Sequence, residues 1–547
     1  MKSFYKLVLL AAAVAATVSC SKSRPEQMQM AENVKIECQP SVLEAVGNDI
    51  PVTIKVTYPK DYFHPEAVMV VTPVLVYEGG TQTSAPYTYQ GDNVKDNNKV
   101  IPSAGGSVIE SFSFRYVEGM EKSYLELRSV AFYGTKRIEI PAVKVADGLR
   151  VNGRIADARG AYKYKDDGYQ EVVRQTTEGR ILYDVNSSSV KPGELRSRSI
   201  KELKDALSEI IADDRYKVTG TRIEAYASPE GGQDLNAKLS DKRAESAQKA
   251  WDSISKGLKA DELQVKSIGQ DWEGFQEAVA NSNIEDKELI LRVLSMYSDP
   301  AVREREIKNM SQVYTEINNK VFPELRRARF ITEVEYKNFT DAELQELSER
   351  AIGMLSEEAL LRVAANSSDI NRKSMLYQLA SEKFGSQKAV YNLAALALDE
   401  DKPGVAEVYV GRLKDSDPEA ENIKGIVALR RGNLDEAEKF FKNSSAPEAK
   451  ENLGLIALMR GDWKTAESCL AGSGSYNEAL TYLINGDTDK ASATLKDDSA
   501  KADYLRAIIA ARKGDAASVK SYLDSACAKD PSLKARAAKD IEFANYR

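Results

Sequence analysis

Short segments in which apolar and polar residues alternate dominate the first part of the chain. Six of them are rich in β-branched and aromatic residues: VKIECQP, IPVTIKVTY, AVMVVTPVLVYE, SVIESFSFRYV, SYLELRSVAFY and RIEIPAVKVA. Turn-forming stretches such as QGDNVKDNN separate them. The pattern predicts six or seven strands, and we expect residues 34–150 to form a β-sandwich of immunoglobulin-like kind.

A different pattern, in which strands alternate with helices, occupies the middle of the chain. Residues 151–179 are polar and weakly patterned, so we expect a linker with one short strand there. From Arg180 to Gly269, apolar strands alternate with segments of helical period, which predicts βαβ units and a sheet covered on one face. A helical insertion over about 272–320 and a closing strand complete a predicted domain over 180–337.

The last third, residues 340–547, is rich in Ala and Leu and contains an internal repeat. Four segments share an apolar first helix, a turn glycine, and a second helix with Ala on its packing face: GIVALRRGNLDEAEKFF, GLIALMRGDWKTAESCL, EALTYLINGDTDKASATL and RAIIAARKGDAASVKSYL. The turn glycines lie 29, 25 and 28 residues apart and are Gly432, Gly461, Gly486 and Gly514. Glycine permits the left-handed conformation that ends a helix. Residues 391–410 form an earlier copy with its glycine displaced to Gly404.

This repeat resembles tetratricopeptide repeats, although its period is shorter than the roughly 34 residues of that family. Each helix pair buries its open side on the next pair, so four aligned copies predict an α-solenoid rather than a generic helical bundle, which is the alternative. Solenoids of this kind supply concave binding surfaces, and we expect protein partners there. The fold class expected for the whole chain is therefore multidomain α+β.

The N-terminus has the pattern of an export signal. Lys2 and Lys6 lead into an apolar run that is too short for a comfortable membrane span. Residues 17–20, TVSC, resemble a bacterial lipobox. The resemblance implies lipidation of Cys20, a tether over residues 21–33, and a lipid anchor in the outer membrane, on its periplasmic face or at the cell surface. The alternative is an ordinary signal peptide over residues 1–20 whose cysteine is incidental.

Residues 224–244, EAYASPEGGQDLNAKLSDKRA, contain the most specific motif. They resemble the peptidoglycan-binding signature of the OmpA-like C-terminal domain. The residues that fall at the family's spacing are Gly231, Asn236, Leu239, Ser240, Arg243 and Ala244. The family's last strand opens with paired arginines, as Arg326 and Arg327 do here. The resemblance covers about 180–337 apart from the insertion, and it implies a βαβαβ domain with peptidoglycan as a partner.

On a helix, Asn236, Ser240 and Arg243 stand at i, i+4 and i+7 and line one polar stripe. Leu235 and Leu239 lie on a neighbouring stripe, which we expect to face the sheet. In the family, the arginine grips the carboxylate of a peptide-stem diamino acid, and a loop aspartate binds its ammonium group.

The sequence departs from the family at that aspartate, because Ser228 takes its place and has no charge for an ammonium. Glu230 offers a carboxylate two residues later, on a loop stiffened by Pro229. We predict Ser228, Asn236 and Arg243 as ligand-binding residues. Their structural alternatives are a turn residue, a side chain that braces the loop, and an exposed helix arginine.

Composition limits the chemistry that the chain can perform. Lys+Arg 76 against Asp+Glu 83 gives a net charge of −7, so nothing indicates a nucleic-acid partner. One histidine and four scattered cysteines exclude the common His/Cys zinc sites and a histidine triad. We therefore expect no metal, no cofactor and no enzymatic activity.

The function predicted from these features is that of a non-catalytic envelope lipoprotein. It would anchor or assemble an outer-membrane or surface complex, with the OmpA-like domain binding peptidoglycan and the repeats binding protein. The alternative is a pure protein-interaction scaffold, such as a fimbrial or secretion accessory, whose OmpA-like domain no longer binds peptidoglycan.

Overall fold

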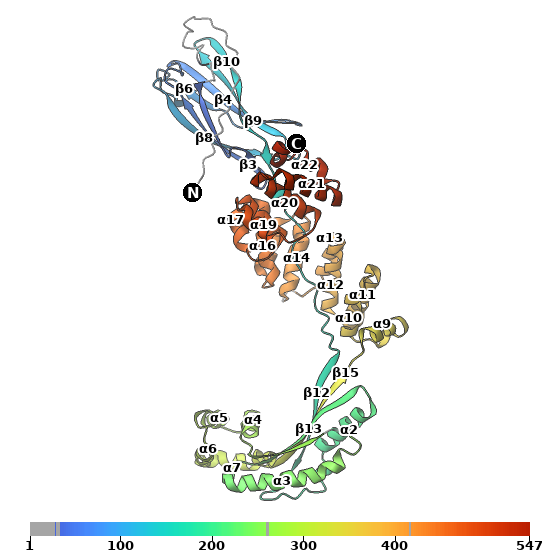
Figure 1. Cartoon of the computed structure of the whole chain (residues 1–547). Helices are drawn as coiled ribbons and strands as arrows, with labels where there is room; N and C mark the ends of the chain where they lie inside the picture. Colours follow the sequence, from blue (N-terminus) through green and yellow to red (C-terminus); the bar gives the residue numbers. More distant parts are fainter. Residues whose placement is uncertain (1–27, 29–32, 259–261, 415–416) are drawn as a thin grey trace. The chain divides into compact units, whose positions relative to one another are not determined.

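The computed structural model describes residue 28 and residues 33–258, 262–414 and 417–547 (Figure 1). Cys20 and the predicted signal peptide lie outside the described residues. The chain forms two compact units: the first combines the residues up to 165 with residues 381–547, and the second comprises residues 166–380. The second unit is therefore an insertion, in sequence, into the first.

The first unit begins with a β-sandwich. One sheet has the order β1-β3-β8, and the other has the order β10-β9-β4-β6-β7 with β5 paired to β4. Every second residue of β3 is buried, and side chains from both sheets meet in one core, as the alternating pattern predicted. The six predicted strands are confirmed, and short strands add to them. The strands are β1 (Lys35–Gln39), β2 (Leu43–Glu44), β3 (Asp49–Tyr58), β4 (Ala67–Tyr77), β5 (Gly80–Thr83), β6 (Tyr87–Gln90), β7 (Lys99–Val100), β8 (Gly106–Arg115), β9 (Ser123–Tyr133), β10 (Lys136–Asp147) and β11 (Leu149–Arg150).

Helix pairs stacked on one another complete the first unit (Figure 1). All four predicted turn glycines have positive φ, between 76° and 87°. The prediction for Gly404 was wrong: Asp401 takes the left-handed conformation with φ 55°, and Gly404 lies inside the next helix. The helices are α12 (Gln387–Asp399), α13 (Pro403–Val410), α14 (Pro418–Arg430), α15 (Leu434–Asn443), α16 (Pro447–Arg460), α17 (Trp463–Leu470), α18 (Tyr476–Ile484), α19 (Thr488–Thr494), α20 (Ala500–Lys513), α21 (Ala516–Lys529), α22 (Leu533–Ala537) and η5 (Ile541–Tyr546).

The predicted linker over 151–179 differs from the structure in both of its halves. Residues 152–165, called the strap below, begin with the short helix η2 (Asn152–Ile155) and then lie against the repeats. Residues 172–179 belong to a strand of the second unit. Apolar periodicity did not reveal the strap because hydrogen bonds to its main chain hold it in place.

The second unit contains a four-stranded sheet of order β12-β15-β13-β14. β13 and β14 run parallel, and β15 is antiparallel to both of its neighbours, from Val172↔Lys337 to Leu182↔Arg327 along β12. Helices α2 and α3 pack on the sheet through a shared core. The elements are β12 (Val172–Leu182), η3 (Glu194–Arg196), α2 (Arg198–Ala212), β13 (Tyr216–Ala227), α3 (Gln233–Ile254), β14 (Leu263–Gln270) and β15 (Arg327–Lys337).

The predicted helical insertion lies between β14 and β15 and has a core of its own. Its helices are α4 (Trp272–Ala280), α5 (Lys287–Met296), α6 (Pro300–Lys308), α7 (Ser311–Lys320) and α8 (Phe322–Leu325). After β15 come α9 (Asp341–Arg350), η4 (Ile352–Met354), α10 (Glu357–Asn366) and α11 (Ile370–Phe384). We expected the repeats to begin at residue 340, but the residues up to 380 group with the second unit. Among the described helices, none is both long and apolar enough to span a bilayer.

Candidate functional site

The three predicted ligand-binding residues lie around the loop that joins β13 to α3. Asn236, in the first turns of α3, donates its side-chain amide to the carbonyl oxygens of Ser228 at 3.0 Å and Gly231 at 2.7 Å. Its side chain is therefore committed to the loop, which is the structural alternative considered for it. Hydrogen bonds from Asn side chains to neighbouring main-chain groups favour turns and helix starts of this kind.

Arg243 lies two turns further along α3 and is only 1% exposed. Its guanidinium donates to three main-chain carbonyl oxygens: Nε to Ser187 at 2.9 Å, Nη1 to Tyr226 at 2.9 Å and Nη2 to Asp184 at 3.1 Å. Burial lowers the pKa of the guanidinium to about 10, so it stays charged at neutral pH. Arg243 is thus neither an exposed helix arginine nor an open fork for a carboxylate.

In the first turns of α3 the burial is the reverse of what the apolar residues suggested. The polar stripe of Asn236, Ser240 and Arg243 is buried, whereas Leu235 is 56% exposed. The expectation that Leu235 faces the sheet was therefore wrong. The polar side chains face inward because the loop and strand ends beside α3 present main-chain carbonyls that need donors.

The carboxylate of Glu230 is held inside the loop region. It accepts two hydrogen bonds from Arg326, from Nε at 2.9 Å and from Nη2 at 3.0 Å, and a third from the Ser228 hydroxyl at 2.9 Å. The Ser228 side chain is 4% exposed. Glu230 therefore does not stand as a free substitute for the family's aspartate.

Arg327, the second of the two consecutive arginines, also forms an ion pair with a buried carboxylate. Arg327 lies 2.8 Å from Asp271, which accepts a hydrogen bond from the Gly274 amide and caps the N-terminus of α4. Burial raises the pKa of Asp271, although the charge of Arg327 opposes that shift. The two ion pairs fix the insertion and the loop to the same end of the sheet.

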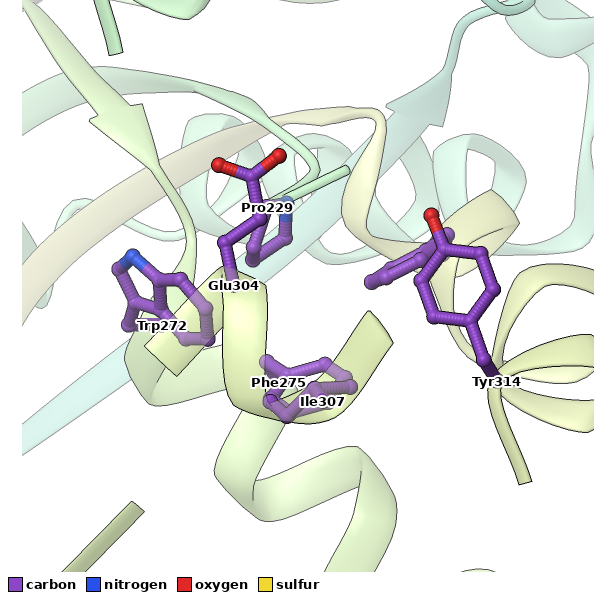
Figure 2. A pocket seen from close by; sticks show the side chains of 7 residues that line it. Pro229, Trp272, Phe275, Glu304, Ile307 and Tyr314 are labelled. Atoms are coloured by element: carbon purple, nitrogen blue, oxygen red, sulfur yellow. The ribbon is translucent and has the colours of Figure 1, made fainter. Parts of the chain in front are cut away.

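Helices of the insertion pack against the loop at Pro229. Figure 2 shows Trp272, Phe275, Ile307 and Tyr314 around Pro229. The cavity left between them has a volume of about 10 Å³, which is room for about one water molecule. A diamino acid does not fit in that space. The described residues contain no group of three or more His, Cys, Asp or Glu side chains placed to hold a metal ion.

A second candidate site, which the sequence analysis missed, lies in the first unit where the repeats hold the strap. Asn477, Asn452 and Asn392 each accept a hydrogen bond from the main-chain N–H of one strap residue and donate one to the carbonyl oxygen of the same residue. The distances are 2.8 and 2.9 Å for Asp157, 2.7 and 2.9 Å for Ala161, and 2.8 and 3.2 Å for Lys165.

The sequence contains a signal for this site. Each of the three asparagines precedes the left-handed residue of its repeat by nine positions, since they are followed by Asp401, Gly461 and Gly486. Asn422 stands ten positions before Gly432 and makes a different set of bonds, to the Ala161 carbonyl and from Asn452. An asparagine at a fixed place in successive helices indicates a shared polar role rather than packing.

Comparison with solved structures finds distant likenesses. No family model and no curated protein sequence matches the chain. A tetratricopeptide repeat protein from Parabacteroides merdae overlaps with 41% of this chain and 94% of its own, at 13% identity and a TM-score of 0.29. The Cut9–Hcn1 hetero-tetramer of the APC/C overlaps with 58% of this chain and 76% of its own, at 14% identity and a TM-score of 0.32. The stacked repeats described above rest on this chain's own helix pairs and turn geometry.

Proposed function

We propose that the chain is a non-catalytic scaffold of the bacterial cell envelope, lipid-anchored through Cys20, that holds protein partners and does not grip peptidoglycan. The observation that carries the proposal is Arg243. A guanidinium that is 1% exposed and donates to three main-chain carbonyls has no open fork for a ligand carboxylate.

The other charged groups near the loop support the same reading. A wall ligand needs a carboxylate to receive its ammonium group, but Glu230 is engaged with Arg326 and Asp271 with Arg327. Opening either pair leaves a buried charge without a partner, which costs several kcal/mol, on the order of 3–5. The remaining large surface is that of the stacked helix pairs, and solenoids commonly use such surfaces to bind proteins.

Co-sedimentation with purified peptidoglycan sacculi tests the loss of wall binding. Soluble residues 21–547 are compared with a Ser228→Asp variant, which restores the family's aspartate. We expect neither protein to pellet, because Arg243 stays occupied in both. Pelleting of the wild type, or of Ser228→Asp alone, would show that Arg243 is available and would contradict the proposal.

Two further measurements test the anchor and the scaffold role. A Cys20→Ala variant should leave the membrane fraction of cells, whereas retention in that fraction would exclude a lipid anchor. Extraction of the wild type in mild detergent should yield an assembly of fixed composition above the 60.4 kDa of one chain. A species of single-chain mass would contradict the scaffold role.

A further inference from the structure

The strap is held through its main chain at every fourth residue. Asp157, Ala161 and Lys165 are each bound at both N–H and C=O by one asparagine of the repeats, in reverse order along the chain. An asparagine side chain has the same donor and acceptor as a peptide group, so these contacts recognise the main chain of the strap, which turns at residues 158–159 and has Gly160 at φ 77°. These three asparagines and the neighbouring Asn422 are buried, with exposed fractions between 1% and 7%: Asn392, Asn422, Asn452 and Asn477.

The strap satisfies this row of amides. Each of the three bidentate asparagines has one donor and one acceptor paired with the same strap residue, and each such hydrogen bond contributes about 0.5–1.5 kcal/mol over the bonds to water that it replaces. The same strap segment supplies all of those partners. The row, called the asparagine ladder below, is thus a built peptide site whose occupant is part of the same chain.

Side chains on both sides of the contact define what kind of peptide fits. Lys163 lies 2.8 Å from Glu448, and Lys165 lies 2.8 Å from Asp417 and also pairs with Glu419. The repeats therefore present carboxylates opposite the lysines of the strap.

Tyrosines alternate with these lysines. The hydroxyl of Tyr164 donates to Asp399 at 2.6 Å, and that of Tyr162 donates to the same carboxylate. A peptide in which tyrosine and lysine alternate, as in the strap's Ala-Tyr-Lys-Tyr-Lys, matches these groups in charge and in hydrogen bonding.

The surface beside the strap is open. A groove of about 770 Å³ runs between the strap and the first helices of the repeats, and its lining includes Asp399, Glu451, Asn452, Tyr476 and Asn477. Two members of the asparagine ladder thus border open space. An incoming peptide can contact the groove before the strap has left it.

We propose that the asparagine ladder is a binding site for a peptide like the strap, in which a turn with glycine precedes alternating tyrosine and lysine, and that the strap is a built-in ligand that a partner must displace. The proposal rests on the proposed scaffold function only in naming the class of partner that the repeats take. A tethered segment acts at an effective concentration of about 1 mM, so a free peptide with a Kd of about 10 μM for the empty site binds the wild type about 100-fold more weakly.

The test measures binding of a fluorescent peptide of residues 153–167 to the full chain by anisotropy. Two strap variants weaken the internal contact and leave the repeats unchanged. Ala161→Pro/Lys165→Pro removes two N–H donors of the ladder contact, and Lys163→Glu/Lys165→Glu sets like charges against the carboxylates of the repeats. Circular dichroism reports whether each variant keeps its helices.

We expect the peptide to bind both strap variants at least tenfold more tightly than the wild type. Adding Asn452→Ala to either variant should weaken that binding at least tenfold, and a peptide with glutamate in place of both lysines should not bind. If one strap variant does not fold, the other decides. Equal binding to the wild type and the folded variants, absence of binding to a folded variant, or binding that Asn452→Ala leaves unchanged would overturn the proposal. Sacculi play no part in this assay, so its failure is distinct from failure of the proposed function.

Discussion

Replacing Arg243 with methionine tests whether its guanidinium stabilises the fold or is reserved for binding a ligand. The substitution keeps much of the side-chain volume and removes the donors to the carbonyls of Asp184, Ser187 and Tyr226. An arginine whose only role is to bind a ligand is dispensable for folding. An arginine that donates hydrogen bonds to three buried main-chain carbonyls is not dispensable.

The size of the effect follows from those three bonds. A hydrogen bond from a charged donor contributes about 1.5–3 kcal/mol, so three contribute roughly 4.5–9 kcal/mol before the cost of burying the charge. That burial cost amounts to several kcal/mol. We therefore expect Arg243→Met to lower the free energy of unfolding of the second unit by about 3–5 kcal/mol, a large part of the 5–15 kcal/mol typical of a domain.

Urea titration followed by tryptophan fluorescence measures this loss. The chain has 3 tryptophans, and in a Trp463→Phe background the remaining two, Trp251 and Trp272, both lie in the second unit. With a slope of about 2 kcal/mol per molar urea, the midpoint should fall by roughly 1.5–2.5 M.

Lys242→Met is the matched control, because Lys242 is the exposed neighbour of Arg243 on the same helix. Its effect should stay within about 0.5 kcal/mol. A loss of stability for Arg243→Met no larger than that of the control would show that the guanidinium is not needed for folding and is available to bind a ligand.

Three further changes have defined outcomes. Glu230→Gln removes the ion pair with Arg326 and should lower the free energy of unfolding of the second unit by about 1–3 kcal/mol in the same urea assay. An unchanged free energy would show that the ion pair does not contribute to stability. Gly461→Ala and Gly514→Ala both introduce a side chain at positive φ, at an expected cost of about 1–2 kcal/mol. Only Gly461→Ala places its Cβ against another residue, 2.3 Å from Val46 of the sandwich. Its melting temperature should therefore fall further than that of Gly514→Ala. Equal decreases in melting temperature would contradict the packing of the sandwich on the repeats. Burial raises the pKa of Cys38 to about 11, so its neutral thiol is favoured in the folded state. Alkylation near pH 8 should be about 100-fold slower in the native protein than in urea and should rise roughly tenfold per pH unit up to about pH 10; equal rates in both states would contradict burial of the thiol.

The parts of the fold that the sequence predicted well are those that periodicity controls. A strand with one face in a core alternates its side chains, so β3 could be located from its residues alone. The turn of each repeat required a left-handed residue, so Gly432, Gly461, Gly486 and Gly514 marked the helix ends. Where aspartate takes that conformation, as at Asp401, glycine was not a reliable marker.

The parts that the sequence did not predict depend on polar groups that are satisfied inside the protein. The motif brought Ser228, Asn236 and Arg243 together, but spacing alone does not tell whether a donor faces solvent or a main-chain carbonyl. The inward stripe of α3 left Leu235 exposed for that reason. The strap has no apolar period because main-chain hydrogen bonds and the polar ends of its tyrosines and lysines hold it, so hydrophobic patterning predicted a linker there.

The central inference is that the chain is its own ligand where the repeats meet the strap. Hydrogen–deuterium exchange on the full chain, resolved to single residues by electron-transfer fragmentation, tests it directly. We expect protected amides at Asp157, Ala161 and Lys165, and loss of protection at Ala161 in an Asn452→Ala variant. Rapid exchange at all three amides of the wild type would show that the segment is a free linker and would contradict this inference.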